Sequence, residues 1–161
     1  MSPTESPSSS SPPSRSQRKS RDLLEELTVP LRLACHTKAG TGTLWMLSLW
    51  FRYRDGKIQC ATAADADVVA FLESDPHVAF EVSTNDPPYR GVRGNGMATI
   101  TPDPEKAVLT DLLERYLGTT SSPLARSLLR PERAEVTISI EPLRLSEWDF
   151  SERMRETTRE E

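Results

Sequence analysis

The clearest pattern in the chain is the alternation of side chains over residues 43–54, TLWMLSLWFRYR. From residue 45 on, the odd-numbered positions all carry a large apolar side chain, whereas the even-numbered positions are mixed. A repeat of two residues is typical of a β-strand whose faces meet different surroundings, so we predict a strand with one face in the core. The other face is only partly polar, and we expect a partner subunit or a ligand to cover it.

Similar alternation predicts further strands, joined by short turns and by helices. The dipeptide Asp55-Gly56 between two alternating runs is a strong hairpin signal. Apolar residues at helical spacing predict short helices, one with Asp65 as its N-cap and another ending at Gly118. Closely spaced strands linked by hairpins favour a mainly β fold, a β-barrel of about six antiparallel strands with a few short helices. The further strands are expected at 31–37, 57–62, 77–84, 92–100, 134–142 and 143–150, and the helices at 21–27, 65–76, 102–118 and 122–129.

The two ends of the chain differ in composition from the middle. Residues 1–20 contain nine serines and four prolines, so they cannot bury enough apolar surface to offset the entropy of ordering, and we predict a disordered tail. The tail is locally basic and could contact nucleic acid or a membrane, but a solvated tail is the simpler interpretation. We therefore expect one domain at 21–150, followed by a charged C-terminal end at 151–161.

The charge of the expected domain argues against a nucleic-acid-binding surface. The whole chain has a net charge of −4, and residues 22–150 carry 19 acidic and 13 basic side chains, which gives −6. The longest apolar run, residues 43–51, is too short to span a bilayer, and the N-terminus lacks the apolar core of a secretory signal. Cys35 and Cys60 are then expected to be buried reduced thiols in a cytoplasmic protein that binds neither nucleic acid nor membrane.

The sequence contains none of the motifs that carry chemistry on their own. It has no GxSxG nucleophile elbow and no Walker loop, and the GNG of residues 94–96 enters an expected strand rather than a helix. His36 and His77 lack the spacing of metal ligands, so no metal site is predicted. An enzyme with this sequence would borrow its chemistry from a cofactor.

The order of several pieces of the chain resembles the pyridoxamine 5′-phosphate oxidase-like family. The pieces are SLWF, the turn DG, a strand ending in Thr62, a helix closing on Asp75-Pro76, and HVAFEV. The resemblance covers residues 23–148 and implies an FMN-binding split β-barrel that forms a homodimer, with two flavin sites in the subunit interface. It implies a flavin-dependent oxidoreductase that uses FMN and acts on a small organic substrate. A deazaflavin is the nearest alternative cofactor, and haem is a more distant one.

Two rival functions stay open beside the enzyme. One is a non-catalytic dimer that binds a flavin, a deazaflavin or haem, and the other is a dimeric scaffold without a cofactor. A true pyridoxamine-phosphate oxidase is not expected, because residues 143–154, LRLSEWDFSERM, lack the C-terminal Arg-x-His motif of those enzymes.

The resemblance also implies where the flavin phosphate should bind. In the family a Ser-Arg-Lys type run at the start of the helix before Asp75-Pro76 holds the phosphate, but this chain has Ala66, Asp67 and Val68 there. A carboxylate repels a phosphate, and each missing charge-assisted hydrogen bond is worth about 1.5–3 kcal/mol. The usual phosphate contacts are therefore not expected at this helix.

The segment STNDPPYRGVRGNGMATI, residues 83–100, offers other contacts to a phosphate. Arginine suits bidentate phosphate recognition, so Arg90 and Arg93 are candidate cofactor-binding residues, and Tyr89 could stack on a flavin ring. The glycines would let a ligand approach the backbone closely. The alternative is an ordinary wide loop whose arginines pair with surface acids.

Three further positions complete the candidate cofactor-binding residues. Thr62 ends a strand beside the helix start, where the resemblance places a flavin contact. Trp50 lies on the mixed face of its strand and either lines the flavin pocket or packs across the dimer interface. Trp148 lies on a late strand from which related proteins bring an aromatic ring to the cofactor, and core packing is the alternative. No side chain is predicted to act as a catalytic acid or base.

Overall fold

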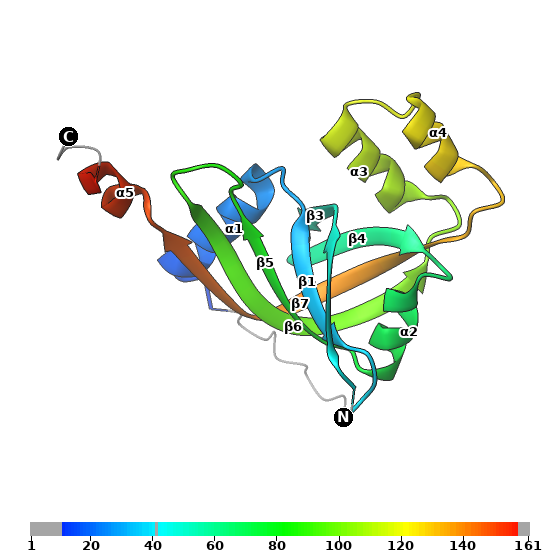
Figure 1. Ribbon diagram of the computed structural model, residues 1–161, viewed down its shortest axis with the longest axis horizontal. Helices are drawn as coiled ribbons and strands as arrows, with labels where there is room; N and C mark the ends of the chain where they lie inside the picture. The colour runs from blue at the N-terminus through cyan, green and yellow to red at the C-terminus, as the bar shows by residue number, and fades with distance from the viewer. Residues whose placement is uncertain (1–10, 41, 158–161) are drawn as a thin grey trace, which may run out of the picture.

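The computed structural model describes residues 11–40 and 42–157, and a curled antiparallel sheet forms its centre (Figure 1). The sheet has seven strands in the order β2-β1-β5-β6-β7-β4-β3. This confirms the mainly β fold class, with seven strands instead of about six. The strands are β1 (Leu31–His36), β2 (Leu44–Leu49), β3 (Phe51–Arg54), β4 (Lys57–Ala63), β5 (His77–Ser83), β6 (Arg90–Pro102) and β7 (Glu135–Asp149). The helices are α1 (Arg15–Glu26), α2 (Asp67–Ser74), α3 (Ala107–Leu117), α4 (Pro123–Leu129) and α5 (Ser151–Thr157).

The sheet curls because its two edge strands are consecutive in the chain. β2 pairs with β1 at one edge, β3 pairs with β4 at the other, and Trp50 alone separates them. The prediction of one strand over 43–54 is therefore wrong, because the chain leaves one edge of the sheet and enters the other at this residue. The hydroxyl of Tyr116 accepts a hydrogen bond from Phe51 N–H at 3.3 Å and donates one to the Val29 carbonyl at 2.9 Å. A side chain thus supplies hydrogen bonds where the strand pairing is interrupted.

β6 and β7 form a long ribbon that extends beyond the barrel. β7 is continuous over 15 residues, so the predicted division into 134–142 and 143–150 is wrong. The register between the two strands shifts between Asn95 and Gly96, and a bulge of this kind bends a strand without ending it. In Figure 1 the end of β7 and α5 project away from the barrel, so the predicted charged end begins with a helix.

The first helix corrects the predicted boundary between tail and domain. Order was expected from residue 21, but α1 begins at Arg15, after a capping box in which Ser14 and Gln17 each bond the other's backbone N–H. Ser20 is buried, and its hydroxyl donates to Glu147 Oε2 at 3.0 Å. A local cap and one packed turn therefore order part of a segment whose composition predicts disorder. Residues 1–10 of the predicted tail lie outside the described residues.

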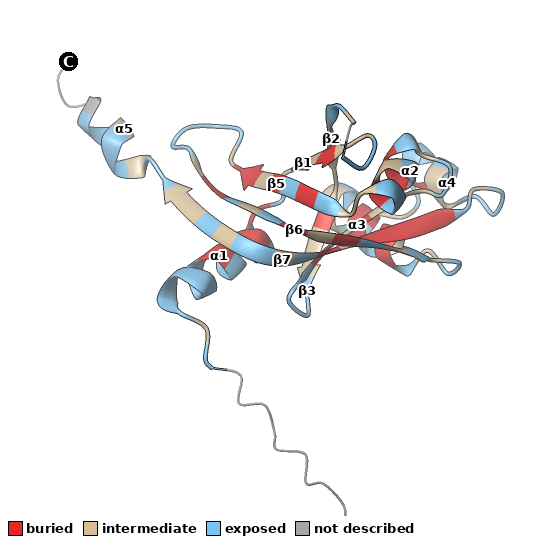
Figure 2. Cartoon of the chain, turned by 90° about the horizontal axis from the view of Figure 1, so that it is seen from below, coloured by how far each residue is buried: buried red, intermediate tan, exposed pale blue. Residues whose placement is uncertain are grey.

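The core fills the interior of the barrel, and helices close it. Phe51 and Ile138 from the sheet are fully buried, as is Leu24 from α1, and Leu72 joins them from α2. A smaller cluster connects α3 and α4 to the barrel through Trp50. Figure 2 shows buried residues along the barrel parts of β5, β6 and β7, and mostly exposed residues at α5 and the start of α1.

The local signals for turns and helix ends hold in two of three cases. Asp55 and Gly56 have φ values of 53° and 74°, as a tight hairpin turn requires, and Gly118 ends α3 with a φ of 68°. The predicted N-cap Asp65 is wrong, because Ala66 holds that position, without a side-chain hydrogen bond, and α2 begins at Asp67.

Two general expectations can also be compared with the structure. Cys35 and Cys60 are buried free thiols, as predicted, and burial raises the pKa of Cys60 to about 12. Among the helices of the described residues, none is long and apolar enough to cross a membrane.

Candidate functional site

The mixed face of β2 continues across β1, β5, β6 and β7 as one open surface. The alternation predicted from the sequence is present here, since Phe51 is fully buried whereas Leu44 and Met46 are 74% and 63% exposed. Strand register places the side chains of this surface in rows that run across the sheet. We call it the open sheet face; its two central rows are Ser48, Arg32, Glu81, Arg93 and Ser146, and Met46, Ala34, Ala79, Asn95 and Arg144.

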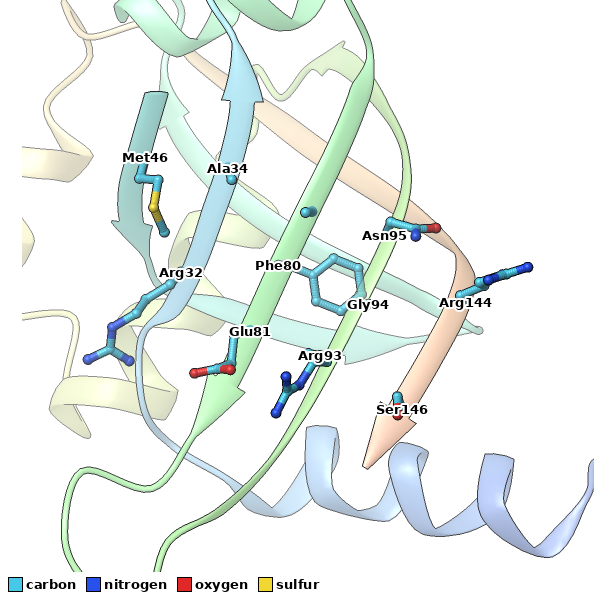
Figure 3. Close-up of a pocket in the computed structure, with 11 residues that line it drawn as sticks. Arg32, Ala34, Met46, Phe80, Glu81, Arg93, Gly94, Asn95, Arg144 and Ser146 are labelled. Carbon is cyan, nitrogen blue, oxygen red and sulfur yellow. The ribbon is translucent and has the colours of Figure 1, made fainter. Parts of the chain in front are cut away.

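A hollow of about 540 Å³ lies on the open sheet face (Figure 3). Arg32, Arg93 and Arg144 line it, and Glu81 lies between Arg32 and Arg93. Within the described part of the chain, none of these three arginines forms an ion pair with an acidic side chain. The hollow is therefore cationic although the whole chain carries −4, and its guanidinium groups suit a phosphate or a carboxylate.

The floor of the hollow is apolar, with Ala34, Ala79 and Phe80 in its lining. Phe80 and Gly94 are register partners, and the buried Phe80 ring lies against Gly94 (Figure 3). A Cβ at position 94 would lie 2.8 Å from Phe80 Cζ and would also meet the Arg144 carbonyl, so a larger residue does not fit. An apolar floor under a cationic rim suits a flat ring that carries an anionic group.

Two of the predicted site residues meet at this face. The Arg93 guanidinium lies 5.7 Å from the centre of the Trp148 ring, a cation–π arrangement. Trp148 pairs with Gly91 in the register, which places its side chain on the same face of the ribbon as Arg93. The indole Nε1–H of Trp148 is buried and has no hydrogen-bond partner among the described residues, so this donor is available to a ligand.

Arg90 does not join Arg93, because the two residues are three apart in one strand and their side chains point to opposite faces. β6 begins at Arg90 rather than at residue 92, so neither arginine belongs to a wide loop. Arg90 Nη2 lies 2.6 Å from Glu26 Oε1 of α1, and this hydrogen bond raises the pKa of Arg90. Tyr89 precedes it and is 40% exposed, with its backbone N–H directed at the Met154 sulfur. Arg90 therefore forms an ion pair with an acidic side chain, which was the alternative to ligand binding that the sequence left open.

Trp50 and Thr62 line a second cavity of about 230 Å³ beside α3 and α4. The Trp50 ring is stacked on Tyr116, with ring centres 5.1 Å apart and planes 6° apart. Arg133 and Glu135 also line this cavity, and Arg133 Nε donates to Glu135 Oε1. The cavity shares no lining residue with the hollow on the open sheet face, so one chain carries two separate groups of predicted residues.

The start of α2 offers no cation to a phosphate, as the sequence indicated. Ala66 is half-buried, Asp67 is exposed and Val68 is buried. None of these side chains donates a hydrogen bond to an anion, and the Asp67 carboxylate would repel one. The arginines of the open sheet face thus suit the anionic group of a cofactor, whereas the residues at the start of α2 do not.

Sequence reasoning missed four residues that shape these sites: Arg32, Arg144, Arg133 and Glu135. Arg32 carried a usable signal, since it is the charged position in an otherwise apolar alternating strand. The other three could not be found in this way. Their positions depend on the register of β7 against β6 and β4 and on the fold of the chain between α4 and β7.

Comparison with known proteins gives matches at the level of structure. No family model matches the sequence, and a search of curated proteins finds no match. A conserved hypothetical protein from Mycobacterium tuberculosis is similar, with a TM-score of 0.67, 25% identity, and coverage of 84% of this chain and 86% of that one. An F420 reductase has a TM-score of 0.65 and 25% identity, and the match covers 78% of this chain and 94% of that one.

A third structure links the fold to the resemblance noted in the sequence. A candidate pyridoxamine 5′-phosphate oxidase from Listeria innocua matches 81% of this chain and 95% of that one, with a TM-score of 0.59 and 15% identity. At that identity the match speaks for the fold alone. The chain thus has the split β-barrel fold of the pyridoxamine 5′-phosphate oxidase-like proteins, and the resemblance is confirmed at this level.

Proposed function

We propose that the protein is a flavin- or deazaflavin-dependent oxidoreductase that acts on a small organic molecule as a homodimer. The observation that carries the proposal is a cationic hollow with an apolar floor, on a fold shared with an F420 reductase over 94% of that protein. FMN is the first cofactor to test, and a deazaflavin is the alternative. Two buried free thiols suit the cytoplasm, where we place the protein.

The residues of the open sheet face would bind and orient the cofactor. Arg32 and Arg144 lie on β1 and β7, on either side of Arg93, and together they would hold the anionic group. Trp148, already stacked under Arg93, would lie along the ring. When bound, the cofactor supplies the hydride or electron chemistry, and the protein supplies binding, orientation and exclusion of water.

A second copy of the chain would complete the site. Leu44 and Met46 leave large apolar side chains exposed on the open sheet face, and a symmetric dimer through this face would cover them. Such a dimer would also bring the cavity with Trp50 and Thr62 of one copy towards Arg93 of the other. This would unite two groups of residues that lie apart in one chain.

The cofactor is tested by the absorption spectrum of the freshly purified protein and by mass spectrometry of what heat releases from it. We expect FMN or a deazaflavin near one per chain, or stoichiometric uptake of one of them when added. Arg93→Ala should weaken binding about tenfold to hundredfold, because a charge-assisted hydrogen bond is lost, while the exposed Arg130→Ala serves as the control. A colourless protein that takes up neither cofactor would refute the proposal.

The dimer is tested by size-exclusion chromatography with light scattering. We expect a mass twice the 18.0 kDa of the chain. Met46→Glu should give a monomer, and Leu143→Glu, an equally drastic change at an exposed leucine of β7 that lies beside α1, should leave the dimer intact. A wild-type monomer, or a dimer that is indifferent to Met46→Glu, would exclude this interface.

A non-catalytic cofactor-binding protein is the second candidate, favoured by the missing cations at Ala66, Asp67 and Val68. Turnover separates the two candidates. The oxidoreductase should pass electrons from a reduced nicotinamide or reduced deazaflavin to an acceptor dye, and the binding protein should not. Oxidation of pyridoxamine 5′-phosphate is not expected from either.

A further inference from the structure

Only one of the two carboxylate oxygens of Glu135 accepts a hydrogen bond from the described residues. Glu135 is the first residue of β7, and its side chain has no solvent exposure. Oε1 accepts the Nε–H of Arg133, whereas Oε2 is buried and has no hydrogen-bond partner among the described residues. A buried charged oxygen without a partner is costly, and native structures contain few of them. Such an atom therefore requires an explanation in function or in a bound group.

Glu135 lines a cavity whose other walls suit a flat ligand. The cavity of about 230 Å³ that Glu135 lines also has Trp50, Thr62 and Leu128 in its wall. The stack of Trp50 on Tyr116 fixes the plane of the Trp50 ring, which gives a flat surface beside the Arg133–Glu135 pair. Complete small-molecule pockets are typically about 300–1,000 Å³, so this cavity takes one end of a ring system rather than a whole cofactor.

The charge of the pair decides which chemistry it recognises. Arg133 and Glu135 sum to zero, so a bare anion would gain little from them, in contrast to the three arginines of the open sheet face. Arg133 directs Nε at Glu135 and keeps its terminal N–H groups for a carbonyl oxygen. Glu135 Oε2 accepts an N–H. The pair is thus complementary to a planar edge in which a carbonyl and an N–H are neighbours.

We propose that Arg133 and Glu135 bind the pyrimidine edge of the flavin or deazaflavin ring, with its ring N–H donating to Glu135 and an adjacent carbonyl accepting from Arg133. The inference rests on the proposed function and adds to it a site that recognises the ring of the cofactor rather than its phosphate. Arg133 lies in the connection 130–134 between α4 and β7 and is 29% exposed, so movement of this side chain admits the ring edge to Oε2.

The test compares two ligands and four forms of the full-length protein. The ligands are FMN and its analogue methylated at the pyrimidine N–H, or the same pair of deazaflavins if the wild type binds only those. The proteins are the wild type, Glu135→Gln, Arg133→Gln and the exposed control Glu132→Gln. Dissociation constants come from fluorescence titration, and urea midpoints report whether each variant is folded.

Methylation should weaken binding to the wild type and to Glu132→Gln by about tenfold, the value of one hydrogen bond to a charged acceptor. Glu135→Gln should bind FMN about tenfold less tightly and should no longer distinguish the two ligands, with a urea midpoint no lower than that of the wild type. Arg133→Gln should weaken the binding of FMN and of its methylated analogue by the same factor. Equal effects of methylation on the wild type and Glu135→Gln would overturn the inference while leaving the proposed function intact. A wild type that binds neither FMN nor a deazaflavin would instead overturn the proposed function.

Discussion

The hydroxyl of Tyr116 is the group whose removal tests how the barrel closes. It lies where β2 ends and β3 begins, accepts from Phe51 N–H, and donates to the Val29 carbonyl. Tyr116→Phe removes this one oxygen and keeps the ring, together with its stack on Trp50. The hydroxyl is partly buried, and burial raises the pKa of Tyr116, so it stays protonated and able to donate at neutral pH.

The size of the effect follows from the bonds that are lost. An intramolecular hydrogen bond contributes about 0.5–1.5 kcal/mol net, and a buried donor left without a partner costs about 1–3 kcal/mol. Phe51 is fully buried, so its N–H finds no water in exchange. The free energy of unfolding should fall by about 2 kcal/mol, which in a chain of this size lowers the melting temperature by about 4–8 °C.

Urea unfolding of the ligand-free protein, followed by circular dichroism, measures this change. The midpoint should fall while the slope against urea stays constant, because the unfolded chain exposes the same surface. Tyr53→Phe is the matched control, since the Tyr53 ring is half-buried and its hydroxyl bonds to no described residue. If the two variants have equal midpoints, the Tyr116 hydroxyl does not hold the barrel closed.

Three further predictions concern other parts of the molecule. Gly94→Ala should lower the free energy of unfolding by about 1–3 kcal/mol in the same urea assay, because the new Cβ would overlap the Arg144 carbonyl of β7 and lie 2.8 Å from Phe80 Cζ; an unchanged midpoint would mean that β7 shifts to make room for the new methyl group. Hydrogen bonds from His77 lower the pKa of Asp75, so the stabilisation from this carboxylate is present above about pH 4 and is lost as the pH falls through the lowered value. In Asp75→Asn the urea midpoint should therefore fall less steeply between about pH 5 and pH 2 than it does in the wild type. If the midpoints of the two proteins fall equally with pH, Asp75 does not have this role. Both thiols are buried with raised pKa values, so neither should react with a thiol reagent at pH 8 until the protein unfolds, and rapid labelling of the native protein would contradict the burial.

Most of the sheet could be predicted from the chain because alternation is a local property. The hairpin at Asp55-Gly56 and the end of α3 at Gly118 depend on the φ angles of one or two residues, which the residue types themselves favour. Predictions failed where a boundary depends on partners that are distant in the sequence. β2 and β3 separate at Trp50 because each pairs with a different strand. The N-terminal part of α1 is ordered in part because Ser20 is buried and donates to Glu147 of β7, 127 residues further along the chain.

The candidate site shows the same division. The missing cations at Ala66, Asp67 and Val68 could be seen in the sequence, and the structure agrees. Arg90 and Arg93 could not be assigned to different sites until β6 was seen to begin at Arg90, because in a loop the two side chains are free to converge, whereas a strand holds them on opposite faces.

The sequence by itself determined the fold class, the acidic charge and the two-faced character of residues 43–54, because these follow from composition and from short-range periodicity. Only the tertiary structure decided which polar groups meet. The row of Arg32, Glu81 and Arg93 crosses three strands, and the pairing of Arg133 with Glu135 beside Trp50 joins segments more than eighty residues apart. Strand register and barrel closure set such meetings, and both arise from the packing of the whole chain rather than from any one stretch of it.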